Sequence, residues 1–234
     1  MTHRLALVGM GKMGKAIAEL APARDWEIVA QLGKREMAAG IARASLGNAD
    51  VAIEFTEPAA APSNIRAIVA TGCPVVCGTT GWYDVLEAVR HDVNSQNGSL
   101  LTAANFSIGV NVFERVVEVA ARLLGRTGGF DAHIIETHHA TKKDAPSGTA
   151  RTLAQAAGAA WGTEIPITSL RVGSFPGTHE FVFDAPFETI HLEHVARDRR
   201  VFAEGALAAA AWLIGRRGVF TMRDVLSISS GNDT

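Results

Sequence analysis

Short apolar runs alternate with helix-like segments through the first hundred residues of the chain. Each run has the length and apolar content of a strand that is buried on both faces of a parallel sheet. The runs lie at residues 5–8, 26–32, 51–55, 74–77 and 100–103. Because strands that alternate with helices favour parallel pairing, this part of the chain predicts an α/β fold with a Rossmann-like sheet.

The pattern changes after residue 107. Residues 108–124 repeat apolar side chains at helical spacing, and an alanine-rich segment at 150–161 predicts another helix. Further strand-like stretches lie at residues 130–137, 167–172, 179–184 and 188–194. The last three are short and are joined by turns rich in proline and glycine, which is typical of antiparallel hairpins. This part therefore predicts a smaller α+β domain with a mixed sheet.

An alanine-rich helix is predicted at residues 202–216, and we expect it to return to the first domain. We therefore assign residues 1–106 and 205–234 to a dinucleotide-binding domain. Residues 107–204 are assigned to a substrate-binding and oligomerisation domain.

Composition and charge exclude several classes of protein. Of the 234 residues, 47% are hydrophobic and 20% are charged, as in ordinary globular proteins. The formal net charge of −2 argues against a nucleic-acid partner, since such proteins usually have a clear basic excess. No apolar run reaches the roughly 20 residues that span a membrane, and the N-terminus has no signal-peptide pattern. We expect a cytoplasmic protein without a membrane partner.

The two cysteines, Cys73 and Cys77, flank the strand-like segment CPVVC. This arrangement could belong to a metal pair or to a redox pair. There is no second cysteine pair to complete a zinc site, and the spacing is not CxxC, so buried structural thiols are favoured. We expect no metal site.

A glycine motif follows the first predicted strand and leads into a helix-like segment. It comprises Gly9, Met10, Gly11, Lys12, Met13 and Gly14. A plain strand–turn–helix could carry the same letters, but this context is typical of a dinucleotide site. The first glycine allows a tight turn, the second lets the backbone approach a pyrophosphate, and the third lets the helix lie close to the strand. The helix N-terminus then favours the phosphate charge.

The second predicted strand ends without the acidic residue that usually binds the ribose of NAD. Lys34 and Arg35 stand there instead, and Glu36 comes only after them. A basic pair tolerates or attracts the 2′-phosphate of NADP, although it could also be a solvated turn. Two further segments, Gly78-Thr79-Thr80 and Ala103-Ala104-Asn105-Phe106, follow predicted strands, where ligands of open α/β sheets bind.

The segment 136–150, ETHHATKKDAPSGTA, gathers two histidines, two lysines and a helix start within fifteen residues. Histidines can exchange protons, and lysines together with a helix N-terminus can bind carboxylates. The segment could be a basic loop that only caps a helix, with Ser147 or Thr149 as the capping residue. As a functional site, it would suit a dicarboxylate ligand that must receive a proton.

With these motifs in place, the chain resembles the 4-hydroxy-tetrahydrodipicolinate reductases, also called dihydrodipicolinate reductases, of the lysine and diaminopimelate pathway. The similar segments are GMGKMG at 9–14, CGTTG at 77–81, AANFSIGVNV at 103–112, ETHHATKKDAPSGTA at 136–150, RVGSFPGTHEF at 171–181 and RRVFAEGALAAAAWL at 199–213. The resemblance implies a Rossmann domain for NADH or NADPH, a C-terminal substrate domain and a homotetramer built through the substrate-domain sheets. It also implies hydride transfer to a cyclic unsaturated imine dicarboxylate.

The resemblance assigns roles to individual residues. His138 matches a histidine that donates or accepts a proton, and Lys142 matches a lysine that donates one. His139 matches a substrate-binding histidine, and Gly148 with Thr149 matches a pair that holds a carboxylate. Residues 9–14, 78–80 and 103–106 match cofactor contacts. The chain departs from many members in its short segment between the second and third strands and in Ala140-Thr141 after the histidine pair.

Two other interpretations stay open at the level of the sequence. One is another Rossmann dehydrogenase, such as an aspartate or homoserine dehydrogenase-like enzyme, which a panel of substrates would separate. The other is a non-enzymatic nucleotide sensor, which would keep the glycines but would have no use for His138 and Lys142.

Overall fold

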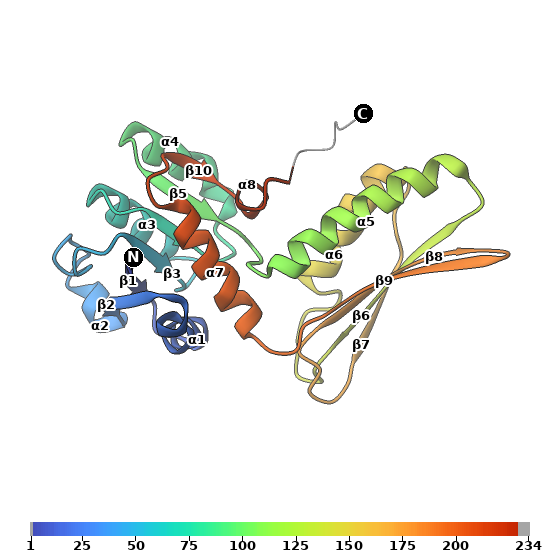
Figure 1. The fold of residues 1–234 in the computed structure, drawn as a ribbon, viewed down its shortest axis with the longest axis horizontal. Coiled ribbons are helices and arrows are strands. Elements are labelled where there is room, and N and C mark those ends of the chain that lie inside the picture. Colours follow the sequence, from blue (N-terminus) through green and yellow to red (C-terminus); the bar gives the residue numbers. More distant parts are fainter. Residues whose placement is uncertain (1, 229–234) are drawn as a thin grey trace. The chain divides into compact units, whose positions relative to one another are not determined.

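The computed structural model describes residues 2–228 and divides the chain into two compact units (Figure 1). One unit combines the chain up to Ile108 with the chain from Arg200 onwards, and the other is the continuous segment Gly109–Arg199. The C-terminal boundary lies ahead of the last long helix, five residues before the boundary predicted from the sequence. No helix in the described part is long and apolar enough to cross a membrane.

The first unit is built on a six-stranded sheet in which every pair of neighbouring strands is parallel. In the order β10-β5-β4-β3-β1-β2, its strands are β10 (Gly218–Phe220), β5 (Ser99–Thr102), β4 (Val75–Cys77), β3 (Val51–Glu54), β1 (His3–Val8) and β2 (Trp26–Leu32). The chain places β2 on one side of β1 and β3 on the other. The carboxyl ends of β1 and β3 therefore form the switch point at which open α/β sheets bind ligands.

Helices cover both faces of this sheet, so its strands are apolar on both sides. Helices α1 (Lys12–Leu20) and α7 (Arg200–Leu213) belong to one core, with Leu5 and Leu7 of β1. Helices α3 (Ala61–Ala70) and α4 (Leu86–Ser95) belong to the other, with Ala6 and Val8 of the same strand. This double burial explains why the strands appear in the sequence as continuous apolar runs.

Several short elements complete the first unit. They are the 3₁₀ helices η1 (Ala21–Arg24) and η2 (Tyr83–Val85), and the α-helices α2 (Lys34–Ala38) and α8 (Met222–Val225). Neither α2 nor the three-residue strand β10 was expected from the sequence pattern. The basic pair Lys34-Arg35 therefore lies in the first turn of a helix, directly after β2.

The second unit has the mixed sheet that the sequence predicts. Its strands are β6 (Asp131–His138), β7 (Ile167–Arg171), β8 (Thr178–Ala185) and β9 (Glu188–Val195), in the order β7-β6-β8-β9. The β6–β7 pair is parallel, and the β6–β8 and β8–β9 pairs are antiparallel. The predicted β8–β9 hairpin forms, but the hairpin predicted between β7 and β8 does not, because β6 lies between these two strands. Helices α5 (Ile108–Thr127) and α6 (Gly148–Trp161) lie along one face of this sheet (Figure 1).

The face of the second sheet that packs against α5 and α6 is apolar in the middle of β6 and polar at its carboxyl end. Alternate residues of a strand share a face, and on β6 these are Ile134, Glu136 and His138, all buried. Ile134 faces Phe181 of β8 across the ladder, and Glu136 faces His179. The apolar core therefore continues into a polar cluster at the carboxyl end of β6.

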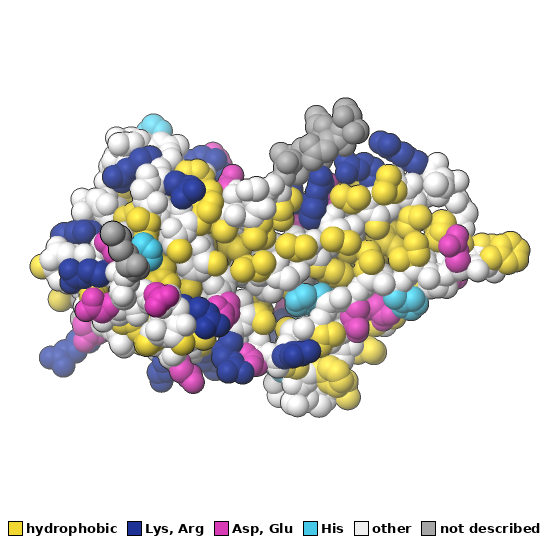
Figure 2. All heavy atoms as spheres, viewed as in Figure 1, with side chains coloured by type: hydrophobic (Ala, Val, Ile, Leu, Met, Phe, Trp, Pro, Cys, Tyr) yellow, Lys and Arg dark blue, Asp and Glu magenta, His cyan; other side chains and the backbone are white. Residues whose placement is uncertain are grey.

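The opposite face of the second sheet is open in this chain. Leu170 of β7 is 47% exposed and Val195 of β9 is 52% exposed, and Phe187 in the β8–β9 turn is fully exposed. Figure 2 shows hydrophobic side chains at the surface of this unit, including the tip of the β8–β9 hairpin at the right of the view.

Candidate active site

The glycine motif lies between the end of β1 and the start of α1. Gly9 has φ +98°, and a β-carbon there would meet the Phe55 carbonyl oxygen at 2.0 Å. A β-carbon on Gly14 would meet the Gly9 carbonyl oxygen at 2.0 Å. Gly11 is different, because a β-carbon there would have no atom within 4 Å. The protein itself therefore requires Gly9 and Gly14, whereas the space beside Gly11 is open for a ligand to approach the backbone.

A cavity of about 480 Å³ opens at this switch point. It is lined by Gly9, Met10, Gly11, Gly33, Lys34, Met37, Phe55, Thr56, Glu57 and Ala60. The open backbone at Gly11, the N-terminus of α1 and this cavity fit the pyrophosphate and adenosine part of a dinucleotide. Four of the lining residues were candidates from the sequence. Phe55 to Glu57 follow β3 and were missed, although their position after a buried strand pointed to this edge of the sheet.

The segment Gly78-Thr79-Thr80 follows β4 and is hydrogen-bonded to Glu54, which is fully buried. The Thr79 hydroxyl donates to Glu54 Oε2 at 2.7 Å and accepts from the Thr56 N–H at 2.7 Å. The side chain of Thr79 therefore ties the loops after β3 and β4 together. Because the hydroxyl is already bonded on both sides, a cofactor contact of Thr79 would use its backbone.

The two cysteines are free, buried thiols in the core that contains α3 and α4. Cys77 Sγ lies 3.1 Å from Glu54 Oε2. Burial, together with the charge of Glu54, raises the pKa of the Cys77 thiol far above its usual range, and burial raises the pKa of Cys73 to about 11. Both thiols stay protonated at neutral pH, as expected for structural cysteines.

The segment Ala103-Ala104-Asn105-Phe106 leads from β5 to α5. The Asn105 side chain accepts a hydrogen bond from the Ser107 N–H at 2.8 Å, just before the helix begins. Phe106 is buried, and its ring lies 5.9 Å from that of Phe55, centroid to centroid. Both rings belong to the loops at the carboxyl edge of the sheet.

Lys34 lies at one wall of the cavity, whereas Arg35 is not among the lining residues. Lys34 Nζ is 2.9 Å from Glu57 Oε1, and both side chains are largely exposed. Glu36 turns back to accept the Gly33 N–H at 2.9 Å, so it caps α2. Lys34 and Arg35 thus remain candidates for binding a 2′-phosphate, but the ion pair with Glu57 neutralises part of the charge of Lys34.

We expect the double substitution Lys34→Ala/Arg35→Ala to raise the KM for NADPH about tenfold, because a semi-exposed phosphate contact is worth about 1–2 kcal/mol. The KM for NADH should stay nearly the same. Steady-state kinetics with each cofactor measures both effects, and Arg90→Ala on α4 is a matched control outside the cavity. An equal change for both cofactors, or for neither, would contradict this assignment.

The polar cluster of the second unit is centred on Glu136. The Nδ1–H of His138 donates to Glu136 Oε2. Arg171 Nη2 donates to Glu136 Oε1 at 2.7 Å, and the Ser147 N–H donates to the same oxygen at 3.2 Å. Burial alone would raise the pKa of Glu136, but the hydrogen bonds from Arg171 and His138 outweigh it and bring the pKa to about 2. Glu136 is therefore an ionised carboxylate at neutral pH.

His138 is the histidine of the pair that lies inside the domain. Burial lowers its pKa, and the charges of Lys142 and Arg171 act in the same direction against the opposing effect of Glu136. The ring is therefore neutral at pH 7. Because Nδ1 carries the hydrogen that Glu136 accepts, Nε2 is the nitrogen that can take up a proton.

A second buried histidine, His179, lies beside the first, with ring centroids 5.2 Å apart. Its Nε2 is hydrogen-bonded to the Ser147 hydroxyl at 3.1 Å. Burial and the nearby His138 bring the pKa of His179 to about 4. Ser147 also accepts the Ala150 N–H at 3.1 Å, so it is the N-cap of α6.

The other predicted residues of this segment surround the cluster. Lys142 Nζ pairs with Asp144 Oδ1 at 2.8 Å, and the side chain keeps 23% exposure. His139 is hydrogen-bonded to the Thr141 hydroxyl at 2.8 Å. Lys143 is exposed. Gly148 and Thr149 lie in the first turn of α6, where helix N–H groups can donate hydrogen bonds to an anion.

Glu136, Arg171 and His179 were missed as candidates. Glu136 could have been found, since it stands two residues before His138 and so shares its face of the strand. Arg171 and His179 come from β7 and β8 and meet Glu136 only through the strand order. Glu136, His138 and His179 also offer atoms within 4.8 Å of one another, which could hold a metal ion. The Arg171 guanidinium on Glu136 disfavours a cation there.

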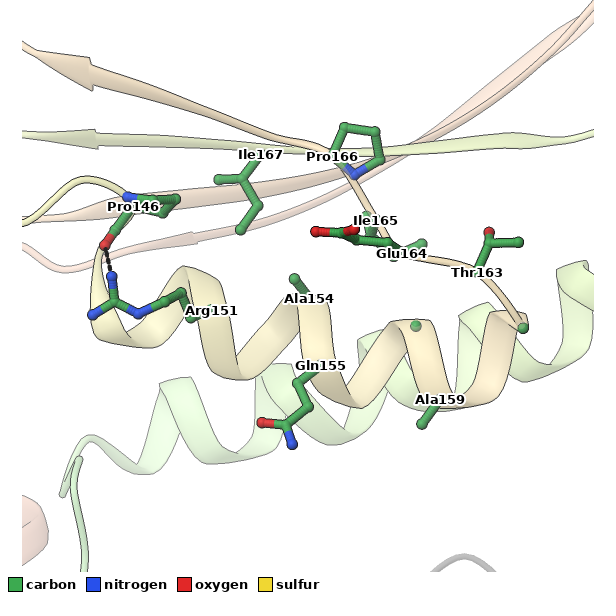
Figure 3. A pocket seen from close by; sticks show the side chains of 12 residues that line it. Pro146, Arg151, Ala154, Gln155, Ala159, Thr163, Glu164, Ile165, Pro166 and Ile167 are labelled. Carbon is green, nitrogen blue, oxygen red and sulfur yellow. Dashed lines mark hydrogen bonds between the residues drawn. The ribbon is translucent and has the colours of Figure 1, made fainter.

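A larger cavity, about 880 Å³, lies between α6 and the segment that leads into β7 (Figure 3). In Figure 3 the Arg151 guanidinium turns to the carbonyl of Pro146, and Glu164 is the other charged residue of the lining. The lining contains no histidine and no lysine. Its chemistry therefore does not compete with the cluster around Glu136.

Comparison with known proteins decides the family. The pattern described as "Dihydrodipicolinate reductase, N-terminus" matches residues 3–106, and "Dihydrodipicolinate reductase, C-terminus" matches residues 109–226. The chain belongs to the dihydrodipicolinate reductase family. The 4-hydroxy-tetrahydrodipicolinate reductase of Christiangramia forsetii is 38% identical over 95% of this chain and 97% of the relative. That of Zymomonas mobilis is 37% identical over 96% and 97%.

Solved structures agree on the fold. A dipicolinate-bound dihydrodipicolinate reductase from Paenisporosarcina sp. TG-14 has a TM-score of 0.80 at 21% identity and covers 94% of this chain and 98% of that chain. An engineered D-amino acid dehydrogenase bound to NADP⁺ has a TM-score of 0.61 at 14% identity, covering 100% of this chain and 98% of that chain. As a member of the family, the chain is an oxidoreductase that uses NADH or NADPH, and the predicted combination of a Rossmann-like domain and a mixed-sheet domain is confirmed.

Proposed function

We propose that this chain reduces 4-hydroxy-tetrahydrodipicolinate to tetrahydrodipicolinate in lysine and diaminopimelate biosynthesis, with His138 and Lys142 as its proton-handling residues. The observation that carries the proposal is the His138–Glu136 pair with Lys142 and the start of α6 nearby, in a chain of this family. The cofactor belongs to the unit that contains the glycine motif, and the substrate belongs to the unit that contains the cluster.

The substrate is a dicarboxylate, and the second unit offers several groups for its two negative charges. Lys142 supplies a cation, His139 a ring nitrogen, and Gly148 with Thr149 the N–H groups of a helix start. Ionic hydrogen bonds of this kind are stronger than neutral ones, and several together fix the orientation of a cyclic dicarboxylate. Asp144 holds the Lys142 side chain until a carboxylate takes its place.

The overall reaction consumes one hydride and one proton and releases the 4-hydroxyl group as water. NAD(P)H supplies the hydride when it is bound. Hydride addition leaves an enamine-like carbon that requires a proton, and in this proposal Lys142 donates it. His138 can accept a proton at Nε2 and return it, with Glu136 stabilising the charged ring.

The alternatives from the sequence are not favoured. An aspartate or homoserine dehydrogenase would not need the cluster around Glu136, and the relatives that match over most of the chain are named as 4-hydroxy-tetrahydrodipicolinate reductases. A nucleotide sensor would have no use for a buried acid–base pair. The test is the oxidation of NADH and NADPH, followed by absorbance, with the substrate made in situ. Turnover that needs this substrate supports the proposal, whereas turnover only with oxaloacetate and ammonia would contradict it.

We further propose a cytoplasmic homotetramer that is built through the open face of the second sheet. Exposed apolar side chains on that face, such as Leu170 and Val195, support this assembly. We expect Leu170→Glu to give a smaller species in size-exclusion chromatography with light scattering, because a charge would be buried at the contact. Leu123→Glu, at an exposed apolar position on α5, is the control and should leave the mass unchanged. A tetramer in the Leu170→Glu variant would rule out this face.

A further inference from the structure

Glu136 is bonded to three different elements of the second unit at once. Its side chain has no exposed surface. Oε2 accepts from His138 on the same strand, and Oε1 accepts from Arg171 at the end of β7 and from the backbone of Ser147 at the start of α6. Arg171 also donates to the Asp144 carbonyl, in the loop that carries Lys142. A buried carboxylate with this set of partners does more than neutralise one charge, because it also joins three elements of the unit.

We infer that Glu136 is a positioning residue, which fixes the ring of His138 with Nε2 available for proton transfer and anchors the carboxylate-binding start of α6 to the same point. The inference rests on the proposed function for its catalytic meaning. Its structural content, the orientation of the ring, stands on the hydrogen bonds alone.

The orientation of the ring follows from the acceptor. An ionised carboxylate has no hydrogen to donate, so the His138 nitrogen that faces it must carry one. The neutral ring therefore has its hydrogen on Nδ1 and a lone pair on Nε2. A proton that arrives at Nε2 creates an imidazolium, and the negative charge of Glu136 favours that state.

Other charged groups around His138 act against Glu136. Lys142 from the loop after β6 and Arg171 from β7 both lower the pKa of His138, and the ring of His179 on β8 lies against it. With only these groups present, the ring would take up a proton much less readily. Glu136 is the anionic group that offsets them, and Arg171 in turn keeps Glu136 ionised.

The second task of Glu136 concerns the start of α6. The Ser147 N–H is held by Glu136, and the Ser147 hydroxyl is held by Ala150 N–H and by His179. The N-cap is thus fixed from both sides before any ligand arrives. The first turn, with Gly148 and Thr149, is therefore set in place relative to the ring of His138.

The first test needs no substrate. Nitrogen-15 NMR of the histidine side chains should show His138 as the Nδ1–H tautomer in the wild-type protein, with its signal assigned through His138→Gln. In Glu136→Gln the pKa of His138 should fall, because the group that raises it has lost its charge. The control is Glu164→Gln, which removes an exposed carboxylate of the same unit, in the segment before β7 and outside the open face of the sheet.

The second test is kinetic. Glu136→Gln should lower kcat by about 100-fold, within the range for loss of acid–base help, and should shift the pH profile of kcat in the direction of the lowered pKa. Glu136→Asp, which keeps the charge but draws it back by one methylene, should recover part of the activity. Glu164→Gln should keep kcat within about twofold and leave the profile in place.

The outcomes separate this inference from the proposed function. A wild-type His138 that carries its hydrogen on Nε2, or a folded Glu136→Gln protein with an unchanged His138 pKa, overturns the positioning role whatever the enzyme reduces. The expected tautomer and pKa shift in a protein without reductase activity would uphold the orientation and refute the proposed function instead.

Discussion

Replacing Lys142 by alanine is expected to lower kcat and raise the KM for the substrate together. Lys142 serves both as a cation for a carboxylate and as a proton donor. Its loss therefore weakens substrate binding and also removes stabilisation of the transition state. General acid help contributes about 10²–10⁴-fold, which sets the expected fall in kcat/KM. His138→Gln should instead lower kcat with a smaller change in KM, because the ring matters when charge develops.

The neighbouring Lys143 is the internal control. It has the same side chain, is one residue away and is exposed, so Lys143→Ala should cost little. Steady-state kinetics on the three variants, with melting temperatures to check folding, compares them directly. If the loop were only a solvated cap, all three changes would be similarly mild. Near-normal turnover by a folded Lys142→Ala protein would refute the mechanism.

Two of the motif glycines, Gly11 and Gly14, are expected to separate cofactor binding from folding. Gly11→Ala should leave the melting temperature unchanged, because a β-carbon there meets no protein atom within 4 Å. It should weaken NADH and NADPH binding by about 100-fold, since the β-carbon stands where the pyrophosphate must approach, a loss equivalent to about 2.7 kcal/mol.

Gly14→Ala should act mainly on the stability of the fold, whereas Gly11→Ala acts on cofactor binding. Its β-carbon would lie 2.0 Å from a backbone oxygen of Gly9, so α1 must move away from the loop. Overpacking of this kind typically costs about 1–3 kcal/mol, and the melting temperature should fall. Thermal unfolding and titration with each cofactor measure both variants. Tight dinucleotide binding by a folded Gly11→Ala protein would place the cofactor elsewhere.

Apolar pattern and turn chemistry predicted most of the elements. The strands of the first sheet are buried on both faces and therefore stand out as continuous runs, and the Ser147 cap was one of two candidates named. The strand β10 was missed because its three residues, Gly218–Phe220, carry no periodicity and acquire their structure only by pairing with β5. Pairing between distant segments is a tertiary property that local pattern does not contain.

The same reason limits what the sequence says about the site. The segment 136–150 indicated the position of the candidate site, because its residues are neighbours along the chain. Arg171 and His179 join Glu136 through the order β7-β6-β8, which no local pattern encodes. In the first unit, Thr79 was named as a cofactor contact, but its hydroxyl serves Glu54. Sequence identified the residue and its loop, and only the fold identified the direction of its side chain.

The order of elements along the chain also governs when each unit can be completed during synthesis. Helix α7 contributes Ala203, Ala206 and Leu213 to the core that covers one face of the first sheet, and α7 follows the whole of the second unit in the sequence. The part of that face that α7 covers stays open to water until residue 213 has left the ribosome, because domains are made from the N-terminus onwards. The second unit is one continuous segment, Gly109–Arg199, and has all of its elements before then. The unit that begins the chain is therefore the last to close its core.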